Sequence, residues 1–351
     1  NAERTGGMEI FLKIIEGGWA ALLEYLSAHV ITCLIPAFFI AGAISLFVSQ
    51  GAVLKYFGPK AKKWLSYSVA SVSGTILAVC SCTVLPLFGG IYKRGAGIGP
   101  AIAFLYSGPA INVLAIVYTA QILGFDFGLA RAIGAVGFAA GIGLIMAFLF
   151  RKDESLKDSS AFDALDTDDG GKTWYQQIIF FVTLVGILVF LASKNWIVAG
   201  VLFAVLFVIL WRWFSRNELW MWMKETWRFV KLIVPWLLGG VFAAGIITTF
   251  LPPEAVTSWV GTNTIPANFI ASILGALMYF ATLTEVPIIS SFMNLGMHKG
   301  PVLALLLAGP ALSLPSMLVI RSIMGTKKTL AFIGLVIVFA TLTGYVFGLI
   351  Q

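Results

Sequence analysis

Two cysteines stand out as residues that could carry chemistry in this 351-residue chain. Cys80 and Cys82 lie in the apolar run Ala78–Pro86, separated by one serine. Thiolates suit soft, thiophilic species. On a regular helix, positions i and i+2 point about 200° apart, so the two thiols can reach one atom only where the backbone is unwound. Pro86 gives a reason for unwinding, because it has no N–H for the carbonyl of Cys82, and the sequence predicts a helix break there.

Glu285 is an acidic residue in the middle of a second apolar stretch, where the sequence reads Thr284-Glu285-Val-Pro287. A carboxylate at membrane depth is costly and by default marks a transport pathway or a proton relay. We therefore interpret Glu285 as a candidate proton-coupling group. The alternative is a polar anchor for the free N–H groups at the start of a half-helix, which is compatible with a place in a site.

Small polar residues close to the prolines complete the candidate site. They can contact a substrate, or they can satisfy backbone groups that a broken membrane helix leaves free. Cys33 could supply a third thiol, although core packing explains it as well. The sequence indicates no catalytic residue and no zinc site, and it assigns a soft, thiophilic species to Cys80 and Cys82. The other substrate-binding candidates are Ser81, Thr83, Pro86, Ser107, Asn112, Thr284, Ser313 and Ser316.

The elements that must position these residues are membrane helices. The chain is 59% hydrophobic and 11% charged, against about 45–50% and about 25% in soluble domains. Apolar windows of roughly 20 residues, enough to cross the hydrocarbon core, recur along the whole chain. The net charge of +7 fits the Lys and Arg that membrane proteins collect on the cytoplasmic side. No basic stripe with interleaved aromatics indicates nucleic acid, and no phosphate-binding G-x-x-x-x-G-K-[ST] motif is present, so ATP does not drive this chain directly.

The second half of the sequence repeats the Gly and Pro positions of the first half. Apolar segments that Gly or Pro interrupts at matching places in two halves are a good pointer to a transporter binding site. An offset of 201 pairs Thr282–Pro287, which contains Glu285, with Ser81–Pro86. With an offset of 201, Pro86 meets Pro287, Gly95 meets Gly296, Gly99-Pro100 meets Gly300-Pro301, Gly108-Pro109 meets Gly309-Pro310, and Gly124 meets Gly325.

The distribution of Lys and Arg favours an inverted arrangement of the two halves. If all ten apolar elements cross the membrane, the two sides carry 14 and 9 of these residues. If Tyr67–Ile91 and its partner Ile265–Met293 re-enter instead, the split becomes 18 to 5, and re-entry of the other broken element gives 17 to 6. Both splits satisfy the positive-inside rule better. The sequence therefore predicts an all-α polytopic membrane protein with two inverted repeats, about eight full spans and two re-entrant elements, with ten full spans as the alternative.

Charge and hydropathy also divide the chain into five segments. Acidic residues cluster between the two halves and indicate a solvated loop. The predicted segments are an N-terminal interfacial helix (1–28), a first transmembrane repeat (29–150), an acidic cytoplasmic loop (151–174), a linker helix pair with an interfacial segment (175–228) and a second transmembrane repeat (229–351).

Residues from about 30 to 350 resemble the ArsP-type permeases, a family of predicted membrane permeases. The family includes efflux permeases for trivalent organoarsenicals, so the resemblance implies a membrane permease of this kind. Many members have no assigned substrate, so the resemblance leaves the cargo open. The residues that carry it are Ala78–Pro86, the Gly95–Pro100 turn, Ser107–Asn112, Thr284–Pro287 and Leu307–Pro310.

We expect a secondary-active permease of the inner (plasma) membrane that exports a thiophilic small molecule, with trivalent arsenicals first among the candidates. A monomethyl trivalent arsenical has two exchangeable positions, which matches two thiols. A permease for another sulfur- or metal-containing compound and a membrane thiol oxidoreductase are the alternatives. The expected partners are the substrate and the lipid bilayer. The sequence indicates no cofactor, no enzymatic activity and no nucleic acid, and it is compatible with a homo-oligomer.

Overall fold

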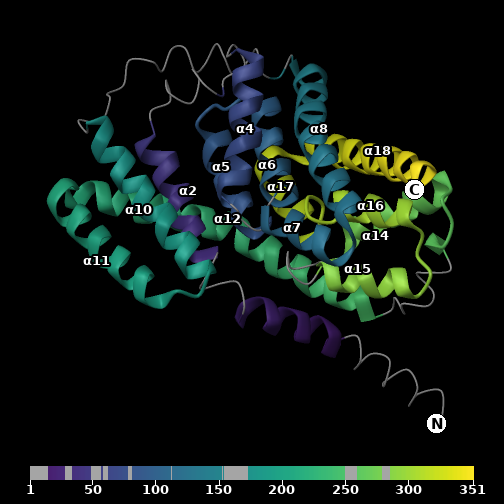
Figure 1. The fold of residues 1–351 in the computed structure, drawn as a ribbon. Helices are drawn as coiled ribbons and strands as arrows, with labels where there is room; N and C mark the ends of the chain where they lie inside the picture. The colour runs from purple at the N-terminus through teal and green to yellow at the C-terminus, as the bar shows by residue number, and fades with distance from the viewer. Residues whose placement is uncertain are drawn as a thin grey trace, which may run out of the picture. The chain divides into compact units, whose positions relative to one another are not determined.

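Every regular element in the described part of the chain is a helix (Figure 1). The computed structural model describes residues 15–27, 34–48, 57, 62–77, 81–111, 113–151, 153, 173–249, 259–278 and 285–351. The helices are α2 (Ile35–Phe47), α4 (Lys63–Leu77), α5 (Ser81–Lys93), α6 (Ile98–Ala110), α7 (Val113–Ile122), α8 (Phe125–Leu149), α10 (Trp174–Ala192), α11 (Trp196–Trp213), α12 (Arg216–Thr249), α14 (Ile265–Leu277), α15 (Glu285–Asn294), α16 (Lys299–Ala308), α17 (Leu314–Met324) and α18 (Thr326–Ile350).

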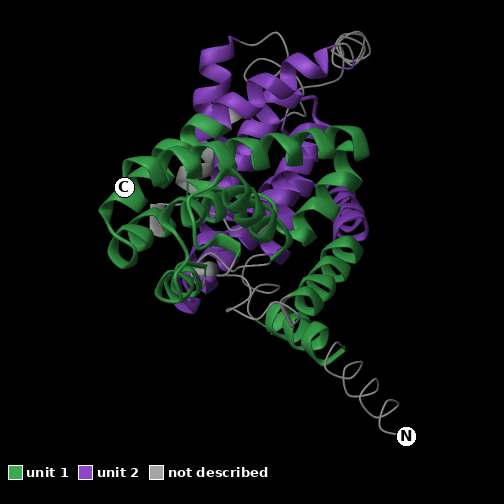
Figure 2. Ribbon diagram, turned by 90° about the vertical axis from the view of Figure 1, so that its right-hand side faces the viewer, with its two compact units in different colours: residues 1–28, 109–138, 234–351 green, residues 29–108, 139–233 purple. Residues whose placement is uncertain are grey.

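The chain forms two compact units, each built from separate stretches of sequence (Figure 2). Helices α6, α8 and α12 each contribute residues to both units. Unit 1 therefore combines part of the first predicted repeat with most of the second. Unit 1 comprises residues 1–28, 109–138 and 234–351, and unit 2 comprises residues 29–108 and 139–233.

Four helices among the described residues are long and apolar enough to cross a membrane, namely α8, α11, α12 and α18. Helices α6 and α7 make a fifth if they are one bent span. The remaining apolar helices, such as α14 and α16, are 10–17 residues long. The predicted all-α membrane class is confirmed. The eight spans with two re-entrant elements and the inversion of the repeats stay predictions, as do the ten spans.

The sequence offset of 201 recurs in the backbone conformation. Gly95 and Gly296 have φ angles of 96° and 103°, and Gly124 and Gly325 have φ angles of 112° and 84°. These values lie in a region that glycine adopts without strain. Helices α8 and α18 also begin and end at residues that differ by 201. The turns that the repeat predicted therefore occur in both halves.

Each half also contains the same glycine-mediated helix crossing. In unit 2, a Cβ on Gly143 of α8 would lie 2.7 Å from the carbonyl oxygen of Gly99 on α6. In unit 1, a Cβ on Gly344 of α18 would lie 2.7 Å from the carbonyl oxygen of Gly300 on α16. Small residues let helix backbones approach this closely, which replaces hydrophobic burial as the packing device inside a membrane.

The structure corrects the predicted break at Pro86. Helix α5 runs through Pro86 from Ser81 to Lys93, so the helix does not end at this residue. Because Pro86 is the sixth residue of α5, its missing N–H leaves only the Cys82 carbonyl in the first turn without its helical partner. Similarly, α6 continues through Pro109 and ends one residue later.

Helix α12 runs across the predicted boundary between the linker segment (175–228) and the second repeat (229–351), as one helix of 34 residues with Pro235 inside it. The division into segments stays a prediction. Helices α10 and α11 are joined by a tight turn at Lys194, which has a φ angle of 56°. Of the predicted acidic loop, only Arg151, Asp153 and the residues from Thr173 onward are among the described residues.

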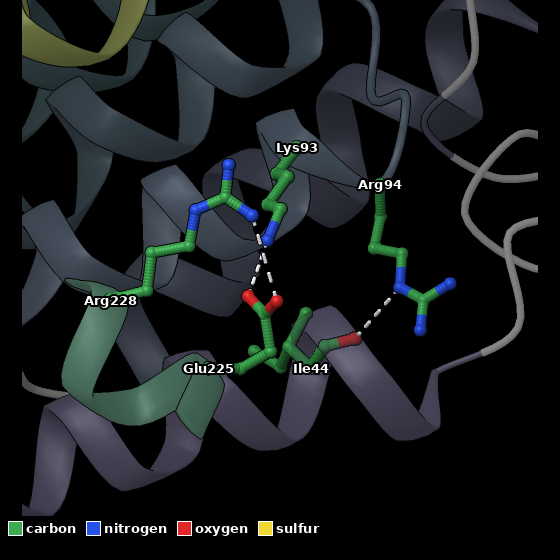
Figure 3. A network of polar contacts seen from close by, with 5 residues as sticks. All are labelled: Ile44, Lys93, Arg94, Glu225 and Arg228. Atoms are coloured by element: carbon green, nitrogen blue, oxygen red, sulfur yellow. Dashed lines mark hydrogen bonds and ion pairs between the residues drawn. The ribbon is translucent and has the colours of Figure 1, made fainter. Parts of the chain in front are cut away.

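The end of α5 is held to α12 and α2 by a polar network in unit 2 (Figure 3). Lys93 pairs with Glu225, and Arg228 lies 3.7 Å from the other oxygen of the same carboxylate. The Arg94 Nε donates to the Ile44 carbonyl at 3.3 Å. These pairs are partly exposed, so each contributes little to stability.

The glycine crossing yields a stability prediction. Gly344→Leu should lower the melting temperature in detergent, because a side chain at this position meets the backbone of α16 and overpacking typically costs about 1–3 kcal/mol. Gly334→Leu on the same helix is the matched control, since no atom lies within 4 Å of a Cβ there. Equal melting temperatures for the two variants would contradict the crossing.

Candidate functional site

Unit 1 contains a buried ion pair between α8 and α15. The Arg131 Nη2 donates to the Glu285 Oε2 at 2.9 Å, and the two side chains are 0% and 2% exposed. A single buried charge without its partner costs several kcal/mol, so each of these groups requires the other. The carboxylate that the sequence singled out is therefore not an isolated charge.

Thr119 on α7 connects the ion pair to a third helix. Its hydroxyl accepts a hydrogen bond from the Arg131 Nη1 at 3.0 Å and donates to the Ala115 carbonyl at 2.6 Å. The hydroxyl thus uses both its proton and a lone pair. One polar network in unit 1 consequently joins α7, α8 and α15.

The start of α15 places the carboxylate at a favourable position. Glu285 is the first residue of the helix and Pro287 the third. A proline in the first turn removes an N–H that would have no helical partner in any case. An acidic side chain there also benefits from the positive end of the helix dipole. Local sequence and helix electrostatics therefore both favour a charged group at this point.

The predicted Gly309-Pro310 motif lies beside the same carboxylate. Helix α16 ends at Ala308 with Gly309 as its C-cap. A Cβ on Gly309 would lie 3.3 Å from the Glu285 Oε1, and a Cβ on Gly275 of α14 would lie 3.2 Å from the Gly309 nitrogen. The end of α16 thus approaches both Glu285 and α14 without an intervening side chain.

The ion pair leaves one donor and one acceptor for a further polar group. Within the described part of the chain, the Arg131 Nε and the Glu285 Oε1 are buried and have no hydrogen-bond partner. A guanidinium edge can make two parallel bonds to a carboxylate, and only one is made here. Buried polar atoms without partners are rare in proteins. This pair can therefore exchange a proton, or contact a polar group of a ligand, without first losing another bond.

The polar network has no polar counterpart at the positions that the repeat relates to it. The residues 201 positions away from Glu285, Arg131 and Thr119 are all apolar. They are all buried as well, with exposed fractions of 0–1%. The fold therefore forms with buried apolar side chains at the equivalent sequence positions. This favours a functional role for the charges over a purely structural one. These counterparts are Val84, Phe332 and Ile320.

The remaining predicted site residues fall into three groups. Ser313 and Ser316 are buried at the start of α17 and hydrogen bond to each other, with 2.7 Å between their hydroxyl oxygens. Ser107 is buried on α6 and donates to the Ala70 carbonyl at 3.1 Å. Thr83 and Pro86 are buried on α5, where Ser81 and Cys82 are described by their backbone alone. The candidates outside the described residues are Cys33, Cys80, Asn112 and Thr284.

Arg131 and Thr119 are the residues of this network that sequence reasoning missed. The charge count placed every Lys and Arg in a loop, whereas Arg131 lies inside α8 and is fully buried. A signal was available, because a carboxylate at membrane depth needs a cation or another partner close by. Arg131 follows the Gly124 turn by seven residues, within an apolar stretch.

Several helices long and apolar enough to span a membrane, one of which carries a buried ion pair, define the class of multi-pass membrane proteins. The chain belongs to the ArsP_1 family, described as predicted permeases, which it matches over residues 17–349. The resemblance that the motifs carried is thus confirmed.

Three relatives show how far the similarity extends. UPF0718 protein MJ0584 of Methanocaldococcus jannaschii is 44% identical over 98% of both chains. UPF0718 protein YraQ of Escherichia coli is 21% identical over 92% of this chain and 79% of its own. A Streptococcus mutans protein, named as a candidate subunit of a two-component membrane permease complex, is 24% identical over 87% of this chain and 88% of its own. No solved structure matches the chain.

The burial of the pair predicts strong coupling between its two members. Glu285→Leu or Arg131→Met alone should destabilise the protein by about 3–5 kcal/mol, because each leaves one buried charge unpaired. The double variant should be close to the wild type, since it removes both charges. Unfolding in detergent, followed as a double-mutant cycle, measures the coupling. Lys93→Met, in the partly exposed pair with Glu225, is the control and should cost at most about 1 kcal/mol. Additive losses at residues 131 and 285 would contradict the pairing.

Proposed function

We propose that the protein is a secondary-active permease that exports a thiophilic small molecule, with trivalent organoarsenicals as the first candidates. The family of predicted permeases supports the transport class. The observation that carries the mechanism is the buried pair of Arg131 and Glu285 beside Gly309. Intramembrane ionisable groups that face one another commonly form part of a substrate or proton pathway.

Proton coupling follows from the charge balance of this pair. A proton that binds the unpartnered Glu285 Oε1 neutralises the carboxylate and leaves Arg131 as an unpaired buried charge. An unpaired charge buried at this position costs several kcal/mol. Protonation of Glu285 therefore favours a second arrangement of the helices that carry Arg131 and Glu285. Loss of the proton restores the pair. The proposed role of Glu285 is to link proton binding to this exchange, with Arg131 as its counter-ion.

The substrate chemistry of the proposal rests on the cysteines. Each thiol of Cys80 and Cys82 would replace one hydroxyl on a trivalent methylarsenical, forming a sulfur–arsenic bond and releasing one water. The oxidation state of arsenic does not change in this exchange. The spacing of the two cysteines and the family membership support this assignment. The polar candidates Ser81, Thr83, Ser107, Asn112, Thr284, Ser313 and Ser316, together with Pro86, complete the proposed binding set.

Two further points belong to the proposal. A permease for another sulfur- or metal-containing compound is the second candidate, because the thiols select for soft partners in general.

The proposed location is the inner (plasma) membrane. The name of the Streptococcus mutans relative also raises assembly with a second component, besides a homo-oligomer.

The thiol assignment predicts a loss of resistance. Cys80→Ser and Cys82→Ser should each abolish resistance to methylarsenite in a sensitive host, because a hydroxyl binds trivalent arsenic far more weakly than a thiolate. Cys33→Ser is the control and should keep resistance. Expression must be equal by immunoblot. Normal resistance in the Cys80→Ser/Cys82→Ser double variant would exclude the thiol role.

The coupling assignment predicts gradient-dependent transport. Uptake of methylarsenite into everted vesicles should rise when the lumen is acidified and collapse when a protonophore is added. Glu285→Gln should remove this dependence, because an amide cannot exchange a proton at neutral pH. Glu225→Gln, in the partly exposed network of unit 2, is the matched control and should keep it. Gradient-dependent uptake by Glu285→Gln would contradict the proposed role.

A further inference from the structure

Unit 2 carries an apolar groove between α2, α10, α11 and α12. Its volume is about 480 Å³, and every side chain that lines it is apolar or aromatic. The one polar group of Trp222, its indole N–H, already donates to the Phe39 carbonyl at 2.8 Å. The groove therefore suits a hydrocarbon chain better than a polar solute. Lining residues include Phe39, Ile187, Gly200, Phe203, Leu206 and Met223.

One end of the groove lies close in sequence to a group of exposed cations. Met223 lines the groove, and on α12 the residues at i−3 and i−7 share its helix face. These are Trp220, which is 72% exposed, and the exposed Arg216. Lys224 follows Met223 directly, and Arg212 ends the adjacent helix α11. A tryptophan among cations is typical of the membrane–water interface.

The acidic groups in this region are already bound. The Glu218 carboxylate accepts hydrogen bonds from the Ser215 N–H at 2.7 Å and the Ser215 hydroxyl at 2.9 Å. The Glu225 carboxylate is paired with Lys93 and Arg228. Arg212, Arg216 and Lys224 outnumber the Glu218 carboxylate, whose hydrogen bonds come from neutral groups, so the charge near the groove is net positive. At the α10–α11 turn, beyond the other end of the groove, the structure describes a single cation, Lys194.

We propose that this groove binds an anionic phospholipid, with an acyl chain between α2, α10, α11 and α12 and the phosphate near Arg212, Arg216 and Lys224. The apolar lining selects the chain, and the cations select a negatively charged head group. The site is separate from the network of Arg131 and Glu285, so the inference does not depend on the transported substrate.

Lipid binding to the purified protein tests the proposal. Native mass spectrometry in detergent counts bound lipid after addition of dioleoyl phosphatidylglycerol or dioleoyl phosphatidylcholine, which differ only in the head group. The wild type should retain the anionic lipid at least about tenfold better. Arg212→Gln/Arg216→Gln/Lys224→Gln should lose this preference. Lys194→Gln, at the opposite turn, should keep it.

A groove-filling variant tests the place of the acyl chain. Gly200 lines the groove, and no atom lies within 4 Å of a Cβ there, so Gly200→Phe should fill the groove without disturbing the fold. This variant should lose the tightly bound lipid, whereas Gly334→Phe, on the open face of α18, should retain it. Equal binding of both lipids to the wild type would overturn the proposal. The proposal would also be overturned if Gly200→Phe changed the oligomeric mass and left the bound lipid unchanged. That result would assign the groove to a protein partner.

Discussion

The described part of unit 1 depends on one constraint. A charged side chain buried among apolar helices needs an opposite charge in direct contact with it. Arg131 and Glu285 satisfy it at 2.9 Å, in side chains that are almost fully buried. The start of α15 and the Thr119 hydroxyl add further polar partners. Gly309 leaves room for the carboxylate at the end of α16. Helices from both halves of the sequence are therefore tied together by a single charge pair.

The two halves repeat one scaffold, and of the two sets of positions that the repeat relates, one carries the charge pair and the other is apolar. The glycine crossings and left-handed turns occur at matching positions in both halves. Val84, Phe332 and Ile320 occupy the positions that correspond to Glu285, Arg131 and Thr119. Since the apolar version is buried equally well, the charged version adds a cost that folding does not require. A transport role gives a physical reason for retaining that cost.

The sequence predicts the scaffold well because glycine and proline act locally. The turns at Gly95 and Gly296 are predictable because glycine adopts a positive φ angle without strain. The all-α membrane class follows from composition alone. Glu285 was also predictable as a candidate site residue, because one carboxylate in an apolar stretch is conspicuous.

Other features depend on tertiary packing and could not be predicted in the same way. The contact between Arg131 and Glu285 joins residues 154 positions apart, so no local pattern reports it. Pro86 misled the prediction, because a proline near the start of a helix removes only one hydrogen bond and the helix continues through it. The continuity of α12 was missed for a related reason, since a charged amphipathic segment can extend directly into a span.

Transport by the uncharged double variant Arg131→Met/Glu285→Leu tests the central claim most directly. This variant removes both charges together, so it separates a functional role of the pair from a structural one. If the pair couples transport, the double variant should assemble in the membrane at wild-type levels and show no gradient-driven uptake of methylarsenite into everted vesicles. Gradient-driven uptake at the wild-type rate would contradict the claim and would assign the pair to structure alone.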